Sequence, residues 1–347
     1  MKRTKRILST LLLAGLLATV VVGLGAWKVF GRFRDAPWGS PEEKIVDVPS
    51  GASPRTVVRL LARAGVLSDD RTAWLYVRWV RRDPRPFKAG QYAFAGALRP
   101  DEVLDRIHRG EVKLYRFTVP EGLRIEEVAE IIGRSGLARA EEVARLARDP
   151  AVASALDVPF PTLEGYLFPD TYAFAWGVTP QRILEAMVRR FRDVLAAAEA
   201  KRRPTVLLSE RELVTLASIV EKETGRPAER PRIACVFHNR LKKRMRLQTD
   251  PTVMYATFLR TGRWSKNISK ADLLAPHPYN TYATAGLPPG PIANPGAAAV
   301  EAALAPSDCD DLFFVSKNDG THTFCPDLKC HNAAVQRWQV EFHRRKR

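Results

Sequence analysis

Residues 216–225 read LASIVEKETG, an apolar stretch that ends in two carboxylates. Apolar residues before them recur with the three-and-four spacing of one helix face, which Glu223 continues: Leu213, Leu216, Ile219 and Val220. A glutamate held against an apolar wall has a raised pKa and can donate a proton near neutral pH. Glu221 lies about 200° away around such a helix, so we expect it to face water and to ion-pair with a basic neighbour. The alternative is a frayed helix end, stopped by Gly225 and Pro227, with both glutamates solvated.

Five further segments follow this stretch in order along the chain. They are RLQTDPTV (246–253), YNTY (279–282), GLPPGPIANPG (286–296), HTF (322–324) and HNAAV (331–335). Together with residues 216–225 they resemble the signature of the YceG-like (MltG) family of endolytic murein transglycosylases. Members of this family cut the glycan strands of bacterial peptidoglycan.

The resemblance implies a reaction that one carboxylate performs without a metal or another cofactor. Glu223 would protonate the glycosidic oxygen between N-acetylmuramic acid and N-acetylglucosamine, and then deprotonate the muramyl 6-hydroxyl, which attacks to give a 1,6-anhydro end. Glu223 is preferred to Glu221 because it matches the helix-end Glu-Ser of goose-type lysozyme-like transglycosylases. Gln248, Asn280 and Tyr282 offer neutral donors and acceptors for the substrate, and each also fits a purely structural role.

Two other classes of function remain open from the sequence. One is a non-catalytic peptidoglycan-binding scaffold in which Glu223 is incidental. The other is a hydrolytic muramidase on the same fold, which would leave reducing ends. A hydrolase of the ordinary kind needs a second carboxylate, and Asp250 is the candidate. However, TDPT at 249–252 is also a common start of a helix, and we favour a capping role for Asp250.

The N-terminus predicts a membrane anchor. Residues 7–27 carry no charge and are long enough to cross the hydrocarbon core, and four basic residues precede them. A cleaved signal peptide is the rival interpretation, but basic residues follow where small ones would mark cleavage. We therefore expect a single-pass protein of the bacterial inner membrane, with residues 1–6 cytoplasmic and the chain beyond residue 28 outside.

The chain has 55 Lys and Arg against 38 Asp and Glu, a formal net charge of +17. Such an excess can indicate nucleic-acid binding, but no basic run is interleaved with stacking aromatics and no nucleotide loop is present. The predicted topology argues against nucleic acid as well. The scattered arginines fit either a solvated surface or attraction to lipid headgroups and peptidoglycan carboxylates. The expected partners are thus peptidoglycan strands and the membrane, and the resemblance adds cell-wall synthases.

The four cysteines follow the predicted anchor and so face an oxidising compartment: Cys235, Cys309, Cys325 and Cys330. Three connectivities exist if all four pair. Cys325 and Cys330 can close a small loop, and Cys235, in an apolar helical setting, fits a buried thiol. A zinc site of His322, Cys325, Cys330 and His331 is a further alternative, although its spacing departs from the usual pairs.

We expect an α+β fold in which a strand, a glycine turn and an amphipathic helix recur. The strands are predicted at 44–48, 91–94 and 116–119. The first unit resembles a LysM-like module, which fits glycan binding or a packing platform, and the last part is expected to be lysozyme-like. The expected order is a cytoplasmic N-terminus (1–6), a transmembrane helix (7–27), a linker (28–40), LysM-like αβ modules (41–115), a third αβ unit with a helical connector (116–160) and the catalytic domain (161–347).

Overall fold

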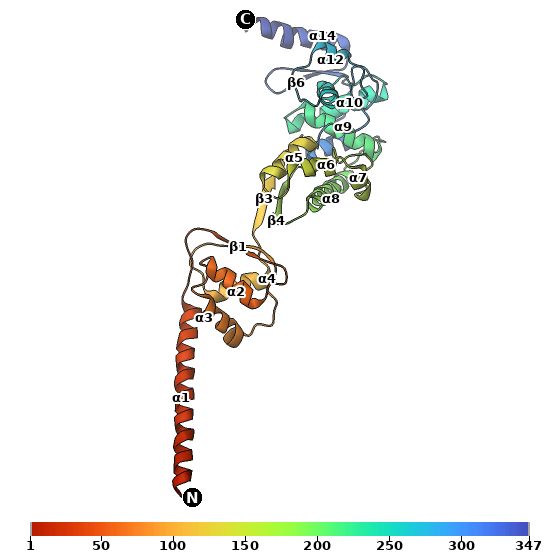
Figure 1. Ribbon diagram of the computed structural model, residues 1–347. Helices are drawn as coiled ribbons and strands as arrows, with labels where there is room; N and C mark the ends of the chain where they lie inside the picture. Colours follow the sequence, from red (N-terminus) through yellow and green to blue (C-terminus); the bar gives the residue numbers. More distant parts are fainter. Residues whose placement is uncertain (1, 346–347) are drawn as a thin grey trace. The chain divides into compact units, whose positions relative to one another are not determined.

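The structure is a computed structural model that describes residues 2–345 and consists of two compact units, Met1–Tyr115 and Arg116–Arg347 (Figure 1). Helices predominate, and the strands form three two-stranded sheets among the described residues. The expected mixture of helix and strand is therefore present.

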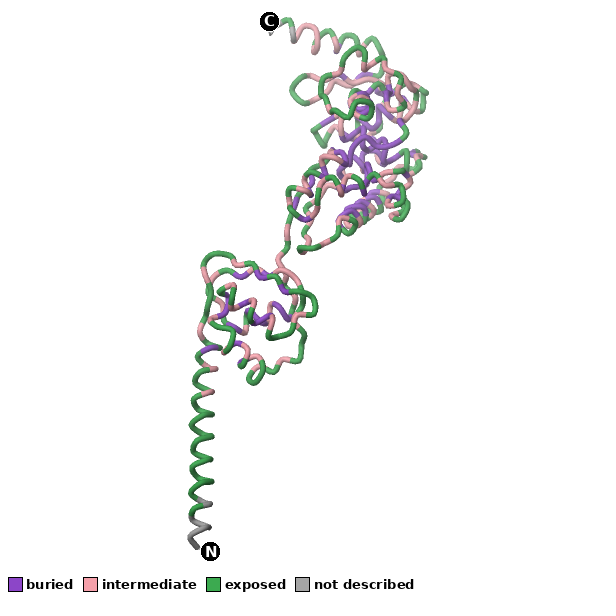
Figure 2. Tube along the Cα trace, viewed as in Figure 1, coloured by how far each residue is buried: buried purple, intermediate pink, exposed green. Residues whose placement is uncertain are grey.

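The first unit begins with the long helix α1 (Lys2–Asp35). It contains a stretch, Thr10–Asp35, that is long and apolar enough to cross a membrane, and its side chains are exposed along most of that length (Figure 2). The expected linker at 28–40 is wrong for its first part, because α1 continues to Asp35. Phe33 is only 6% exposed and belongs to the hydrophobic core of the unit, so burial of aromatic surface extends the helix beyond the apolar span.

The first two predicted strands are confirmed as β1 (Lys44–Val48) and β2 (Gly90–Phe94). They pair with each other antiparallel, with Val46 opposite Tyr92. The two strand–helix units expected from the sequence therefore share one sheet and one core. The helices of this unit are α2 (Pro54–Arg63), α3 (Asp70–Leu75), the π-helix η1 (Tyr76–Arg81) and α4 (Pro100–Arg109).

The third predicted strand is β3 (Leu114–Thr118), which pairs with β4 (Thr171–Ala175), more than 50 residues away in sequence. The third strand–helix unit therefore joins the second compact unit through this pairing. The helices around this sheet are α5 (Ile125–Arg134), α6 (Ala140–Ala147), α7 (Pro150–Ala155) and α8 (Pro180–Glu199).

The centre of the second unit is α9 (Glu210–Glu223), which contains most of the stretch at 216–225. Ser209 begins it with a capping box, in which its hydroxyl accepts from the Glu212 amide and the Glu212 carboxylate accepts from the Ser209 amide. Every residue from 213 to 221 is buried, so the prediction of a single buried face is wrong. The helix is buried all round because other helices pack around it, among them α10, α11 and α13.

The remaining elements follow α9 and build the end of the second unit. They are η2 (Pro227–Glu229), α10 (Arg230–Lys242), α11 (Asp250–Thr261), α12 (Lys270–Leu274), α13 (Ala297–Leu304), β5 (Phe313–Ser316), β6 (His322–Cys325), α14 (Leu328–Val335), η3 (Gln336–Glu341) and α15 (Phe342–Arg345). The strands β5 and β6 form an antiparallel hairpin.

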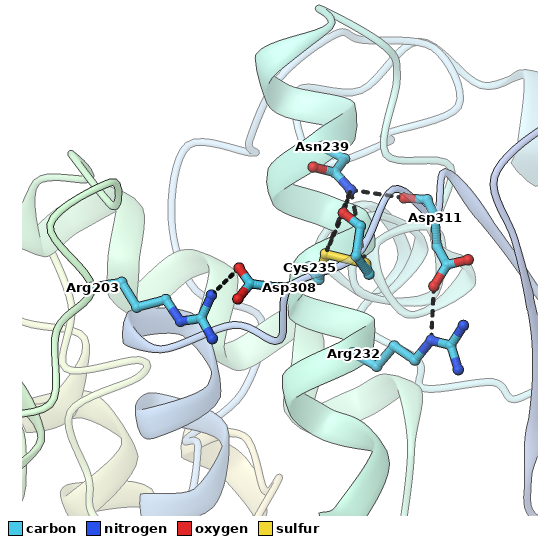
Figure 3. The surroundings of a disulfide bond; sticks show 7 residues. Arg203, Arg232, Cys235, Asn239, Asp308 and Asp311 are labelled. Carbon is cyan, nitrogen blue, oxygen red and sulfur yellow. Dashed lines mark hydrogen bonds and ion pairs between the residues drawn. A yellow bond between two sulfur atoms is a disulfide. The ribbon is translucent and has the colours of Figure 1, made fainter.

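All four cysteines are paired, as Cys235–Cys309 and Cys325–Cys330. The small loop expected for the second pair is confirmed, whereas the buried thiol expected at Cys235 is wrong. The first disulfide fastens the segment before β5 to α10 (Figure 3). Beside it, the Asn239 side-chain amide donates to the carbonyl oxygens of Cys309 (2.8 Å) and Asp311 (3.0 Å).

Candidate active site

A cleft of about 440 Å³ opens at the C-terminal end of α9. It combines ionisable, polar and aromatic side chains that come from distant parts of the sequence. The residues that line it are Glu223, Arg240, Leu247, Gln248, Asp250, Tyr282, Phe313, Phe314, Leu328 and His331. Glu223 is therefore at a cleft, as expected of a group that must meet a substrate.

Burial raises the pKa of Glu223 to about 7, with the negative charge of Asp250 acting in the same direction. Two groups oppose this shift, the Thr249 hydroxyl and, less strongly, the positive charge of Arg240. The Thr249 hydroxyl donates a hydrogen bond to Glu223 Oε1. A carboxyl with this pKa is half protonated at neutral pH and can both donate and accept a proton.

The local backbone explains how Glu223 is held. It is the last residue of α9, and Thr224 is already extended, so the side chain leaves the helix at its end. Thr249 occupies the N-cap position of α11 but makes no side-chain capping bond there. Its hydroxyl is directed to Glu223 instead, which joins the end of one helix to the start of another at the cleft.

Glu221 does not face water, and this expectation is wrong. It is a buried residue whose Oε1 accepts from Arg230 Nη2 at 2.7 Å and whose Oε2 accepts from the Gly296 amide at 3.0 Å. The basic partner that we expected is thus present, but inside the protein. Arg230 also contacts Glu121 at 3.1 Å, and a side chain at Gly296 would overlap the Glu121 carboxylate. Glu221 therefore fastens the end of α9 and does not line the cleft.

Gln248 and Tyr282, both expected to bind substrate, line the cleft. Gln248 is exposed and has a positive φ of 49°, a conformation that costs free energy in a residue other than glycine. The Tyr282 hydroxyl donates to Asp250 Oδ1 at 2.7 Å. Asp250 is the first residue of α11 and does not cap it, so the expected capping role is wrong and its carboxylate is available to the cleft.

Asn280 is not at the cleft, contrary to expectation. It is 1% exposed, and its side-chain amide donates to the carbonyl oxygens of Asp272, Leu273 and Ala275. Its side-chain oxygen accepts from the Tyr282 amide at 3.0 Å. The Asn280 side chain thus joins the end of α12 to the loop that carries Tyr282, since a buried amide needs internal hydrogen-bond partners.

Two features of the cleft wall had no clear signal in the sequence: the side chain of Arg240 and the aromatic start of β5. Arg240 donates from Nη1 to the Leu247 carbonyl (2.7 Å) and from Nε to the Leu312 carbonyl (2.6 Å). It therefore joins the loop before α11 to the start of β5, where Phe313 and Phe314 line the cleft. The Cys235–Cys309 disulfide holds the chain just ahead of this strand (Figure 3). In the sequence Arg240 is one of many scattered arginines, and only the fold distinguishes it.

The Pro/Gly segment at 286–296 was expected to approach a saccharide. It has no regular helix, as predicted, but residues 290–296 are buried. The Ile292 amide donates to the Ser218 hydroxyl of α9 at 3.0 Å, and the Leu167 amide donates to the Asn294 side-chain oxygen at 2.8 Å. This part of the loop is packed against α9 and is absent from the lining of the cleft.

The zinc alternative is also wrong, because Cys325 and Cys330 are joined in a disulfide and cannot act as thiolate ligands. The two histidines separate as well. His331 lines the cleft, whereas His322 Nδ1 lies 2.7 Å from Glu229 Oε2. Within residues 2–345, no group of three or more His, Cys, Asp or Glu side chains is arranged to hold a metal ion.

The fold and the cleft define a protein with a carboxyl of raised pKa at the C-terminal end of a central helix, in a site suited to acid and base chemistry. Comparison with known proteins identifies the family. The YceG-like family matches residues 46–337, and the chain belongs to this family. An endolytic murein transglycosylase of Bacillus subtilis (strain 168) is 32% identical over 309 residues, which are 84% of each chain.

Two further relatives extend the comparison. An endolytic murein transglycosylase of Streptococcus pneumoniae (serotype 2, strain D39) is 28% identical over 78% of this chain, and the match spans 54% of that relative. The crystal structure of a yceG-like protein from Listeria monocytogenes superimposes with a TM-score of 0.57 at 31% identity. That alignment covers 85% of this chain and 99% of the other, so the similarity includes the fold of both units.

Proposed function

We propose that this protein is an endolytic lytic transglycosylase that cleaves the bond between N-acetylmuramic acid and N-acetylglucosamine inside peptidoglycan strands. The observation that carries the proposal is the pKa of about 7 for Glu223 at an open cleft. The two relatives named as endolytic murein transglycosylases support the substrate class.

In the proposed reaction, protonated Glu223 donates its proton to the glycosidic oxygen as the bond to the anomeric carbon breaks. The resulting carboxylate then removes the proton of the muramyl 6-hydroxyl, and that oxygen bonds to the anomeric carbon to close the 1,6-anhydro ring. Proton and electron pairs balance without water, and Glu223 ends protonated. Its pKa near neutrality suits both steps, because the group must be acid and then base.

The cleft residues have distinct proposed roles. Gln248 and Tyr282 bind polar groups of the sugars, and Phe313 and Phe314 offer apolar surface to sugar rings. Thr249 holds Glu223 Oε1, which leaves Oε2 as the oxygen that meets the substrate. The aromatic wall, the helix-end glutamate and the surrounding helices together support the lysozyme-like description of the second unit.

The setting of the enzyme is part of the proposal. The apolar helix α1 serves as an uncleaved single-pass anchor in the inner membrane, with both units on the outer side, and a signal peptide is its alternative. The first unit acts as a LysM-like module near the glycan. Termination of nascent strands would bring the enzyme close to cell-wall synthases.

The decisive experiment is mass spectrometry of the fragments released from polymeric peptidoglycan by the wild type and by Glu223→Gln. Anhydro-ended fragments from the wild type alone are expected. Equal activity of the variant would exclude Glu223 as the acid. Absence of cleavage by a folded, glycan-binding wild type would favour a scaffold.

A hydrolytic muramidase is the second candidate, and one observation favours it. Asp250 lines the same cleft as Glu223 and is available as a second carboxylate, which is what a hydrolase requires. Reducing ends in the same experiment, lost in Asp250→Asn, would identify this reaction. Anhydro ends that persist in Asp250→Asn would leave Asp250 the role of an acceptor for Tyr282.

A further inference from the structure

The first unit exposes a basic helical face that carries a tryptophan. The helix α3 runs without a break into η1, so residues 70–81 form one continuous helical segment. Trp79 is 58% exposed and Leu75 is 37% exposed. Two exposed arginines of this segment, Arg71 and Arg78, lie four and three residues from Leu75. The exposed Arg82 follows the last residue of η1, in a left-handed conformation with a φ of 49°. We call this set the Trp79 surface: Arg71, Leu75, Arg78, Trp79 and Arg82.

Two of the three arginines of the Trp79 surface contact Trp79 itself. Arg78 lies over the Trp79 ring at 5.4 Å, and Arg82 Nε donates to the Trp79 carbonyl at 3.1 Å. Across the described residues, none of the three arginines has a carboxylate within ion-pair distance. Arg81 differs, because it binds Asp101 at 2.7 Å and Asp105 at 2.5 Å. Asp83, Asp101 and Asp105 are thus bound to Arg81 or Arg85, and none of them forms an ion pair with the Trp79 surface.

The Trp79 surface lies near the outer end of α1. Tyr76, in the same helical segment, packs its ring against Phe33 at 5.4 Å and Phe30 at 6.4 Å. In Figure 1, α3 lies beside the C-terminal end of α1, at the point where α1 meets the rest of the first unit. At a rise of 1.5 Å per residue, Phe33 is only about 9 Å beyond Trp27, where the uncharged span ends. The headgroup region of a bilayer spanned by α1 would therefore be within reach of this segment.

We propose that the Trp79 surface binds the anionic phospholipid headgroups of the outer leaflet of the membrane that α1 spans. Trp79 and Leu75 enter the interface between headgroups and acyl chains, where tryptophan is favoured. Arg71, Arg78 and Arg82 bind the phosphates. This contact would fix the orientation of the first unit on the membrane. The inference depends on the proposed anchoring by α1 and is independent of the proposed reaction.

The test uses the full chain in lipid nanodiscs of phosphatidylcholine alone, or with one quarter phosphatidylglycerol. Hydroxyl-radical oxidation of Trp79, read by mass spectrometry of its peptide, reports the exposure of that side chain. We expect oxidation to be at least about twofold slower with phosphatidylglycerol, because the ring enters the interface. A triple variant, Arg71→Gln/Arg78→Gln/Arg82→Gln, should restore fast oxidation. Trp176, which is 49% exposed in the second unit, serves as the reference in every sample.

Three results would overturn the inference, each in a different way. Trp79 oxidised as fast in the anionic nanodisc as in the neutral one would exclude headgroup binding. Protection that survives in the triple variant would exclude the arginines as its cause. A chain that does not co-purify with nanodiscs would remove the anchor and the surface together. Failure of the reaction itself would appear separately, in the glycan fragments released by the same nanodisc samples.

Discussion

Glu223 shows how one residue can be tuned by its neighbours. At its ordinary pKa of 4.5, roughly 0.3% of this carboxyl would be protonated at pH 7, whereas a pKa of about 7 leaves half of it protonated. Burial supplies the shift and Thr249 limits it. Since the acid form begins the proposed reaction, the expected pH dependence of the rate follows directly from this value.

We predict that kcat/KM for glycan cleavage falls about tenfold per pH unit above pH 7, as Glu223 loses its proton. The measurement is a rate profile from pH 5 to 9 on purified glycan strands. A rate that stays constant to pH 9 would contradict a general acid with this pKa.

The same shift should appear in stability. Because the folded-state pKa lies above the unfolded value, the group favours folding below about pH 4.5, and this contribution is lost as the pH rises through 7. Glu223→Gln removes the ionisable group and keeps an acceptor for Thr249. We therefore predict that it is more stable than the wild type by about 3 kcal/mol at pH 8 and nearly equal at pH 4.5. Thermal unfolding at the two pH values tests this, and an equal difference at both would refute it.

Thr249 is a proposed positioning residue, because it acts through Glu223. Thr249→Val removes a hydrogen bond that lowers the pKa of Glu223. We predict a basic limb of the rate profile moved to higher pH and a plateau kcat reduced by roughly tenfold, since the carboxyl is less well oriented. Thr249→Ser keeps the hydroxyl and should retain both properties. A lower rate with an unmoved limb would indicate only structural damage.

The sequence predicted the position of Glu223 for a partly wrong reason. Glu223 is at the cleft as expected, but α9 is buried all round, so a single apolar face does not explain the choice. Glu221 was assigned to water because a pattern within one helix cannot reveal Arg230, which lies on the next helix. The expectation that Asn280 lies at the cleft was wrong for a similar reason, since its three carbonyl partners depend on how the surrounding segment folds.

At the scale of elements, the end of α9 is held by a buried ion pair. Glu221 and Arg230 have side chains that are each only 5% exposed. Removing one partner of such a pair leaves an uncompensated buried charge, which costs about 3–5 kcal/mol. We predict that Glu221→Gln lowers the free energy of unfolding by about 3 kcal/mol and still yields cleavage products below its melting temperature.

Glu223→Gln is the matched control for Glu221→Gln, because it makes the same chemical change two residues away and is expected to lower activity and not stability. It should abolish cleavage without loss of stability. Chemical unfolding together with the fragment assay measures both properties in both variants. An inactive but fully stable Glu221→Gln would reverse the assignment of the two glutamates.

Elements themselves were more predictable than their pairing. The strands at 44–48, 91–94 and 116–119 all form, within two residues at each end, because alternation and turn residues are local signals. Which strands pair is not local. The sequence contains no signal that β3 pairs with β4. The Pro/Gly segment at 286–296 is likewise part of the core because it packs on α9, where the Ile292 amide donates to the Ser218 hydroxyl.

At the scale of the whole molecule, α1 and the rest of the first unit are one structure. The sequence suggested a linker after residue 28, because charge ends the apolar run there. The structure instead places Phe30 and Phe33 of α1 against Tyr76. A helix that continues into a folded core transmits its orientation, so the first unit cannot swing freely about the end of α1.

This continuity predicts where a soluble fragment must begin. Fragment 29–347 retains Phe30 and Phe33, whereas fragment 37–347 lacks both. Loss of a buried phenylalanine costs about 3–5 kcal/mol, so the first unit should unfold at a clearly lower temperature in the shorter fragment. The second unit has its own core and cleft, and its unfolding should not change. Differential scanning calorimetry resolves the two transitions, with Phe33→Ala in fragment 29–347 expected to reproduce most of the effect. If the first unit unfolds at the same temperature in both fragments, then Phe30 and Phe33 do not stabilise it, and a flexible joint separates α1 from the rest of the first unit.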